Sequence, residues 1–91
     1  MEMCRYEADA TATVIGATRE HPFQADTSWT LEGSSLTAQV WRTGKVARVD
    51  DYQDVSGAIG DAARDSGVHA GVGAPIVVDG KLWGVVSRRR R

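Results

Sequence analysis

The sequence has few of the residues that commonly carry catalysis or metal binding. Among its 91 residues there is one cysteine, Cys4, and there are two histidines, His21 and His69. A lone cysteine excludes an intramolecular disulfide, and the Cys and His residues lack the spacing of zinc ligands. We therefore expect no metal site, and a reducing, cytoplasmic location.

Long apolar runs and an excess of basic charge are also missing. The N-terminus lacks the apolar stretch of a signal peptide, and no segment approaches the length that spans a bilayer. Four of the eleven basic residues form the terminal run Arg88–Arg91, so the remaining seven face twelve acidic residues. We expect contact with neither a membrane nor nucleic acid, since the body of the chain is mildly acidic.

The composition is that of one small globular domain. Hydrophobic residues make up 42% and charged residues 25% of the chain, which is ordinary for such a domain. We predict a single domain over residues 1–87 and an arginine tail over residues 88–91. Four charges at a chain end normally stay solvated and attract nucleic acid or acidic lipid only weakly.

Two hairpins frame the sequence. The dipeptide Asp79-Gly80 lies between two apolar runs within residues 71–87, and this pair readily adopts the positive φ angles of a two-residue hairpin turn. A second hairpin is predicted over residues 3–17, with its turn at residues 8–10. Ala10 would take the positive φ there at a cost of about 1 kcal/mol.

Between the hairpins we expect short strands at residues 29–31 and 46–50, a loop over residues 21–27 with Pro22 blocking regular pairing, and two helices. Residues 33–35 offer an N-cap to the first helix, which Gly44 ends. In the second helix, five apolar residues recur on one face of a 3.6-residue period and Gly67 ends the helix. They are Val55, Ala58, Ile59, Ala62 and Ala63. Gly60 weakens this helix by about 1 kcal/mol relative to alanine. The order of elements predicts an α+β fold.

Several segments, in this order along the chain, make the sequence similar to a GAF domain, in particular that of actinobacterial sensor histidine kinases. They are Arg5-Tyr6-Glu7, the stretch from Val40 to Lys45, Ala47-Arg48-Val49-Asp50-Asp51-Tyr52, and Gly67-Val68 leading to the stretch from Val72 to Val85.

The resemblance implies an antiparallel sheet of about five strands, with helices inserted between two hairpins and a ligand pocket on one face. It also implies helices at both chain ends, which this sequence does not contain. We therefore expect a truncated domain whose uncovered sheet face promotes self-association. Through this face the domain would form a homodimer or pair with an intact sensor kinase.

The family pattern places Trp29, Tyr52, Ile59 and His69 along the ligand face, and we take these four residues as candidate pocket lining. Trp83 is interpreted as structural. No cofactor can be named from the sequence. His69 could also serve as a haem or metal ligand, although a lone histidine is more commonly a surface residue.

The remaining candidates have simpler structural interpretations. Cys4 could be a redox sensor or a chromophore attachment point, but a strand cysteine usually packs in the core. Asp50 and Asp51 point to opposite faces of a strand and cannot form an acid and base pair, so a turn or helix cap is favoured. Ser34 and Ser35 lack the context of a catalytic serine and suit helix capping.

Three functions follow from these observations. The first is a non-catalytic regulatory domain that binds a small molecule in a signalling protein. The second is a protein-interaction or dimerisation fragment with no ligand of its own. The third is a small enzyme, but no group of residues in the sequence resembles a catalytic site more than chance would produce. Any kinase activity would belong to a larger parent protein.

Overall fold

The computed structural model describes residues 1–17 and 23–90. His21, Pro22 and Arg91, which entered the sequence-based expectations, lie outside these residues. Within them the order of elements is β1 (Glu2–Tyr6), β2 (Thr11–Ala17), β3 (Ser28–Thr30), α1 (Leu36–Thr43), β4 (Ala47–Val49), the 3₁₀ helix η1 (Tyr52–Asp54), α2 (Ala58–Asp65), β5 (Ala70–Val78) and β6 (Lys81–Arg90). The predicted α+β class is confirmed.

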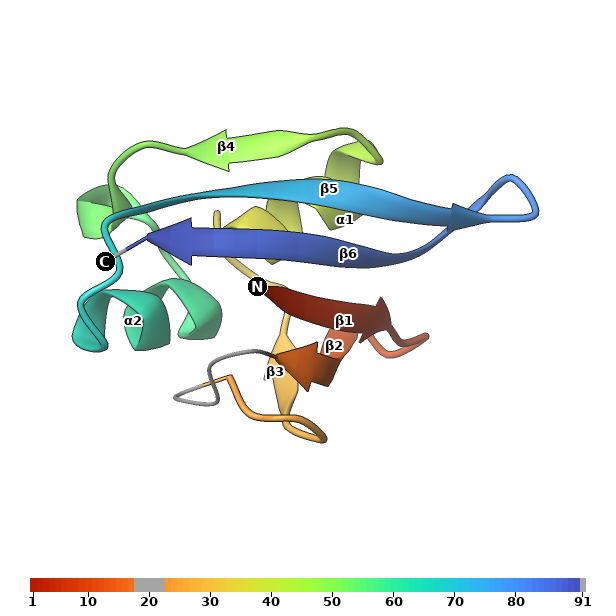
Figure 1. Cartoon of the computed structure of the whole chain (residues 1–91), viewed down its shortest axis with the longest axis horizontal. Helices are drawn as coiled ribbons and strands as arrows, with labels where there is room; N and C mark the ends of the chain where they lie inside the picture. The colour runs from red at the N-terminus through yellow and green to blue at the C-terminus, as the bar shows by residue number, and fades with distance from the viewer. Residues whose placement is uncertain (18–22, 91) are drawn as a thin grey trace.

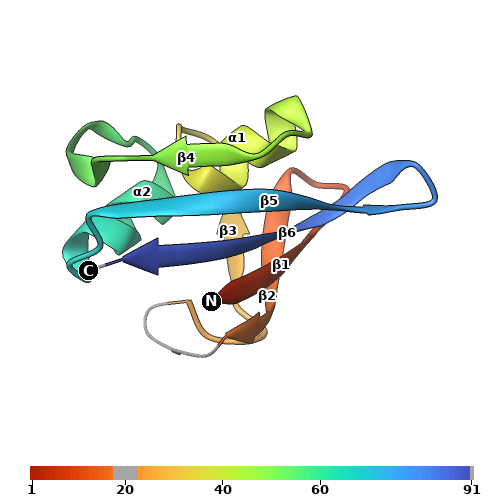
Figure 2. The same ribbon diagram turned by 45° about the horizontal axis from the view of Figure 1, so that its top comes forward.

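The described strands form one six-stranded antiparallel sheet in the order β3-β2-β1-β6-β5-β4. The first and last strands therefore lie side by side in its middle, with Glu2 opposite Ser87 and Arg5 opposite Gly84. The long β5–β6 hairpin extends beyond the other strands at its turn (Figures 1 and 2). Its Asp79-Gly80 turn has φ angles of 52° and 77°, as the sequence predicts.

The first hairpin also forms as predicted, with Ala10 at a φ of 62°. Its partner strands shift register between Met3 and Cys4, which is the signature of a β-bulge. Cys4 is buried, as expected for a small hydrophobic residue on a strand. The core interpretation of this cysteine is therefore confirmed.

Both helices contribute to the core on one face of the sheet, which we call the inner face. α1 packs against β4, β5 and β6, whereas α2 contacts β3 and η1, and Figure 2 shows α1 and α2 behind the long hairpin. The Ser35 side chain accepts a hydrogen bond from the Ala38 amide, and Gly44 closes α1 in the left-handed conformation. Both caps agree with the sequence.

The second helix is shorter than its apolar pattern predicted, because Val55 lies before it. Val55 is buried, but the chain turns at Gly57, whose φ is 94°, before α2 begins at Ala58. Gly60 does not simply weaken the helix as expected. A Cβ at Gly60 would lie 2.6 Å from the Val55 Cγ1 atom, so glycine lets the helix pack back onto the preceding turn.

The core forms one cluster on the inner face. Its larger members come from the sheet, from both α-helices and from η1. Three partly buried residues pack against it, namely Trp29, Tyr6 and Leu82. The buried side chains include Val14, Leu31, Leu36, Val40, Tyr52, Ile59 and Val85. This cluster holds the helices against the sheet and surrounds the polar residues described next.

Candidate functional site

The segments that precede α1 and α2 cross each other at two glycines. A Cβ at Gly33 would lie 2.2 Å from the Ser56 carbonyl oxygen, and one at Gly57 would lie 2.3 Å from the Glu32 carbonyl oxygen. Both glycines have a φ of 94°, which other residues rarely adopt. The Ser34 amide also donates to the Ser56 carbonyl at 3.1 Å. The two helix starts are therefore held together.

The 3₁₀ helix η1 directs Tyr52 into the interior. Asp51 caps η1 by accepting a hydrogen bond from the Gln53 amide at 2.9 Å, which confirms the capping interpretation of this aspartate. From α2, Arg64 donates to the carbonyl oxygens of Tyr52 at 3.0 Å and Val55 at 2.8 Å. Arg64 thus fixes η1, and Tyr52 is only 1% exposed.

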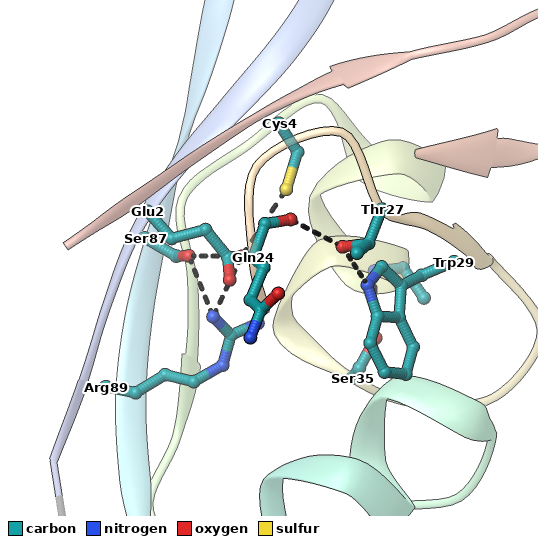
Figure 3. Close-up of polar contacts among 9 residues, drawn as sticks. Glu2, Cys4, Gln24, Thr27, Trp29, Ser35, Ser87 and Arg89 are labelled. Atoms are coloured by element: carbon teal, nitrogen blue, oxygen red, sulfur yellow. Dashed lines mark hydrogen bonds and ion pairs between the residues drawn. The ribbon is translucent and has the colours of Figure 1, made fainter. Parts of the chain in front are cut away.

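A buried ion pair joins the first strand to the last. Nη1 of Arg89 lies 2.9 Å from Oε1 of Glu2, and the two side chains are 9% and 8% exposed. The same Arg89 nitrogen donates to the Ser87 hydroxyl at 3.3 Å, and the Cys4 thiol donates to Oε1 of Glu2 at 3.4 Å. Figure 3 shows these side chains converging on the Glu2 carboxylate. They form a polar centre within the apolar core.

The expectation of a solvated arginine tail is wrong for Arg89. Residues 88–90 belong to β6, and side chains alternate between the two faces of a strand. Arg88 and Arg90 are exposed, whereas Arg89 points to the inner face opposite Gly71. A Cβ at Gly71 would lie 2.8 Å from Leu36 Cδ1 and 3.3 Å from Arg89 Cγ. This glycine makes room for both side chains.

Two aromatic rings adjoin the buried guanidinium. The Cζ atom of Arg89 lies 4.4 Å from the centre of the Phe23 ring, a cation–π geometry. The Phe23 and Trp29 rings are 4.9 Å apart between centres and tilted by 60°. The Trp29 indole nitrogen donates to the Thr27 hydroxyl at 3.0 Å, as Figure 3 shows. Phe23 therefore covers one face of the guanidinium.

Four buried polar atoms have no hydrogen-bond partner among the described residues. They are Nε and Nη2 of Arg89, the Tyr52 hydroxyl and the Thr37 hydroxyl. A buried polar group without a partner costs about 1–3 kcal/mol, and more when it is charged, so a cluster of them in a native core calls for an explanation. Three of these atoms belong to Arg89 and Tyr52, which interact electrostatically.

The surroundings hold these groups in defined protonation states. Burial raises the pKa of Tyr52, while the Arg89 guanidinium opposes this rise. Burial disfavours the charge of Arg89, but Glu2 and Tyr52 outweigh it and raise the pKa of the guanidinium. Burial, followed by the negative charge of Glu2, raises the pKa of Cys4. The Cys4 thiol is therefore protonated near neutral pH and is a poor nucleophile.

The structure brings three of the four candidate pocket residues into one region. Tyr52 and Ile59 belong to the core cluster, and Trp29 packs against it. The His69 side chain is exposed, and only its backbone approaches the others, through a hydrogen bond of 3.0 Å from the Tyr52 amide to the His69 carbonyl. Their role as ligand contacts stays a prediction.

Sequence reasoning missed Glu2, Arg89 and Phe23. A signal for Arg89 was present, since it follows buried Val85 and Ser87 at alternate positions of one strand. The run of four arginines obscured this alternation of buried and exposed positions in the sequence. Nothing in the sequence indicated that Glu2 would be its partner.

A separate groove lies on the opposite, outer face. Arg48, Val72 and Arg88 stand in register there on three neighbouring strands, and they line the groove with Met1, Asp50 and Arg90 among others. The Arg48 and Asp50 side chains are exposed and pair at 2.7 Å. Gly71 and Arg89 also line this groove, whereas Tyr52 and Phe23 do not.

Two kinds of feature are absent from the described part of the chain. Residues 1–17 and 23–90 contain no group of three or more His, Cys, Asp or Glu side chains placed to hold a metal ion. No helix in this part of the chain is long and apolar enough to cross a membrane.

Comparison with known proteins identifies one family and a solved structure of similar fold. The sequence model described as "GAF domain" matches residues 5–91. A solved structure of the chromophore-binding domain of an unusual bacteriophytochrome from R. palustris superposes with a TM-score of 0.64 at 17% sequence identity. The match covers 97% of this chain and 39% of that one. No sequence among the curated proteins matches significantly.

Proposed function

Because the chain belongs to the GAF domain family, we propose that it is a non-catalytic regulatory domain that binds a small molecule at the inner site. The observation that carries this proposal is the group of unpartnered polar atoms on Arg89 and Tyr52, buried beside Phe23. Sites for small molecules typically combine apolar and aromatic walls with a few placed polar groups. The inner site has this composition.

The site is also placed where a ligand could change the conformation of the domain. It lies where β6, η1 and the start of α1 meet, and the crossing at Gly33 and Gly57 couples α1 to α2. A ligand bound to Tyr52 would stabilise the arrangement in which η1 is packed inward. A ligand shifts such an equilibrium by as much as its affinities for the two states differ.

Intrinsic fluorescence tests this function. Replacing Trp41 and Trp83 by phenylalanine leaves Trp29, which packs on Phe23 beside the site, as the only tryptophan among the three in the chain. We expect at least one compound from a library of cellular metabolites to change its emission saturably and to raise the melting temperature. If no compound does either, the sensory role fails.

The larger protein that would use this domain is a sensor histidine kinase of a two-component system, and its location is cytoplasmic. The resemblance of residues 40–45 and 47–52 to such sensors supports this part of the proposal. Its test is a fusion of the chain to a histidine kinase core, with autophosphorylation measured with and without a compound found by fluorescence. A rate that never responds would argue against this output.

A second function is favoured by the outer sheet face. Met3, Ile15 and Val72 are exposed there, and exposed apolar patches commonly mark interaction surfaces. In this alternative the chain is a dimerisation or protein-interaction fragment without a ligand. Sedimentation of wild type and Val72→Asp distinguishes the two: a dimer that the substitution dissociates would support interaction, and a wild-type monomer would remove the support for self-association.

A further inference from the structure

We infer that the inner site recognises a carboxylate, which pairs with Nε and Nη2 of Arg89 and accepts a hydrogen bond from the Tyr52 hydroxyl. This inference rests on the proposed small-molecule function and specifies the chemistry of the ligand. It makes Arg89 and Tyr52 specificity-determining residues.

A guanidinium presents its five N–H groups in a fixed plane. In Arg89 the Nη1 end is used by Glu2 at 2.9 Å and by Ser87 at 3.3 Å. The edge formed by Nε and Nη2 has no partner among the described residues. These two nitrogens direct parallel N–H bonds that match the two oxygens of a carboxylate.

The surroundings restrict approach to that edge. The Phe23 ring covers one face of the guanidinium at 4.4 Å, and the aliphatic stem of Arg89 lies over Gly71 next to Leu36. The Tyr52 hydroxyl lies near both the Arg89 guanidinium and the amide of Leu36, the first residue of α1, without a hydrogen bond of normal geometry to either. A group bound at the free edge would therefore meet Tyr52 and the positive end of a helix dipole.

The charge balance favours a singly charged anion over a phosphate. Arg89 is nine-tenths buried, and Glu2 already supplies one negative charge 2.9 Å away. A phosphate monoester carries about −1.5 to −2 charges at neutral pH, and burying the extra charge beside Glu2 costs both desolvation and repulsion. The aromatic rings of Phe23 and Trp29 suit an apolar or aromatic group attached to the carboxylate.

The test uses benzoate as the probe and benzamide as its neutral counterpart of nearly the same shape. With chloride replacing benzoate at equal ionic strength in the controls, we expect benzoate to shift the Arg89 Nε–H resonance in an ¹⁵N spectrum and to quench Trp29. A charge-assisted hydrogen bond is worth about 1.5–3 kcal/mol, so benzamide should bind at least about tenfold more weakly. Inorganic phosphate should bind more weakly than benzoate.

Two substitutions identify the residues. Tyr52→Phe removes only the hydroxyl, and we expect it to weaken benzoate binding several-fold while leaving the spectrum of the fold intact. Thr37→Val is the matched control, since it removes another unpartnered buried hydroxyl and should leave benzoate affinity unchanged. Arg89→Lys keeps the charge but loses the planar edge that binds both oxygens, and it should weaken benzoate binding several-fold.

The outcomes separate this inference from the proposed function. Equal binding of benzoate and benzamide would overturn the carboxylate inference and leave a small-molecule site. An Arg89 resonance that benzoate does not move would also overturn it, even if a neutral metabolite quenches Trp29. If benzoate binds and both Tyr52→Phe and Arg89→Lys bind it equally well, the carboxylate is held elsewhere and the assignment is wrong.

Discussion

The two ends of the β5–β6 hairpin have the same backbone pairing but opposite surroundings. At the turn, Val77 and Val78 are 56% and 48% exposed. At the far end, Ser87 and Arg89 lie in the core, and α1 covers Gly71 and Gly73. Hydrogen bonding between strands is thus independent of burial here, and what differs is whether a second layer covers the strands.

The small residues of β5 decide where that second layer fits. A Cβ at Gly73 would lie 3.4 Å from the side chains of Val40 and Val85, and one at Gly71 would lie closer still to Leu36. The close approach of α1 excludes water from this end of the hairpin. Charged side chains buried there therefore need partners. At the turn, valine side chains of the same hairpin are exposed to solvent.

Removing one partner of the buried ion pair should have the largest effect. We expect Glu2→Ala to destabilise the domain by about 3–5 kcal/mol, because it leaves the Arg89 charge buried without compensation. Urea denaturation followed by tryptophan fluorescence measures this change. In Glu2→Gln, which keeps an acceptor oxygen, the loss should be smaller.

The matched control is the exposed pair on the outer face. Arg48 and Asp50 are 76% and 79% exposed at the side chain, and Asp50→Ala should change stability by less than about 0.5 kcal/mol. Similar losses in Glu2→Ala and Asp50→Ala would show that the polar centre is open to solvent, and the contrast between the ends would disappear.

A methyl group added at each end of the hairpin gives the second test. At Gly71 it would lie 2.8 Å from Leu36 Cδ1 and 2.9 Å from the Arg88 carbonyl oxygen, and we expect Gly71→Ala to cost about 1–3 kcal/mol. Gly80→Ala meets open space and pays only for its positive φ, about 1 kcal/mol. Thermal unfolding of both variants measures the difference, and an equal loss would refute close packing at Gly71.

Alkaline pH should destabilise the domain through side chains in and against the core. Burial raises the pKa of Cys4 and of Tyr6, so the unfolded chain releases these protons first as the pH rises. Stability is fully present below about pH 8.5, the ordinary thiol pKa, and then falls by at most about 1.4 kcal/mol per pH unit for each group. Urea midpoints across this range test the direction. Cys4→Ala should flatten the first part of the curve, and an unchanged curve would argue against burial of the thiol.

The smallest effect is expected at the turn. Val77→Thr exchanges a methyl group for a hydroxyl at a largely exposed position, so its stability should stay within about 0.5 kcal/mol of wild type. Val85 is fully buried, and Val85→Thr should cost more because it buries a hydroxyl. Chemical denaturation of the two variants compares the exposed turn with the covered part of the hairpin. A large loss in Val77→Thr would mean that another surface covers the turn.

The elements set by local rules could be predicted from the sequence. The Asp79-Gly80 turn, the strain at Ala10 and the capping of α1 by Ser35 and Gly44 all depend on a few neighbouring residues. The order of the predicted elements indicated the α+β class, and the resemblance implied the antiparallel sheet. Within the candidate site, Tyr52 and Ile59 were predicted to line a ligand pocket; both lie in the core, and their role as ligand contacts stays a prediction.

The polar centre could not be predicted because it depends on contacts between distant parts of the chain. Glu2 and Arg89 are 87 residues apart, and their pairing requires the first and last strands to be neighbours. A run of arginines normally indicates a solvated tail. The crossing of Gly33 over Gly57 likewise depends on how two loops meet, which residue preferences do not encode.

The adjacency of β1 and β6 has a mechanical consequence. The strands are antiparallel, with Glu2 opposite Ser87, so β1 begins beside β6 three residues before β6 ends at Arg90, and Figure 1 shows the start of β1 beside β6. A force that pulls the flanks of the domain apart would act across these two strands and peel their hydrogen bonds open one after another. The Glu2–Arg89 pair lies at the point where this peeling begins, so tension between the flanks would reach the polar centre before any other part of the core.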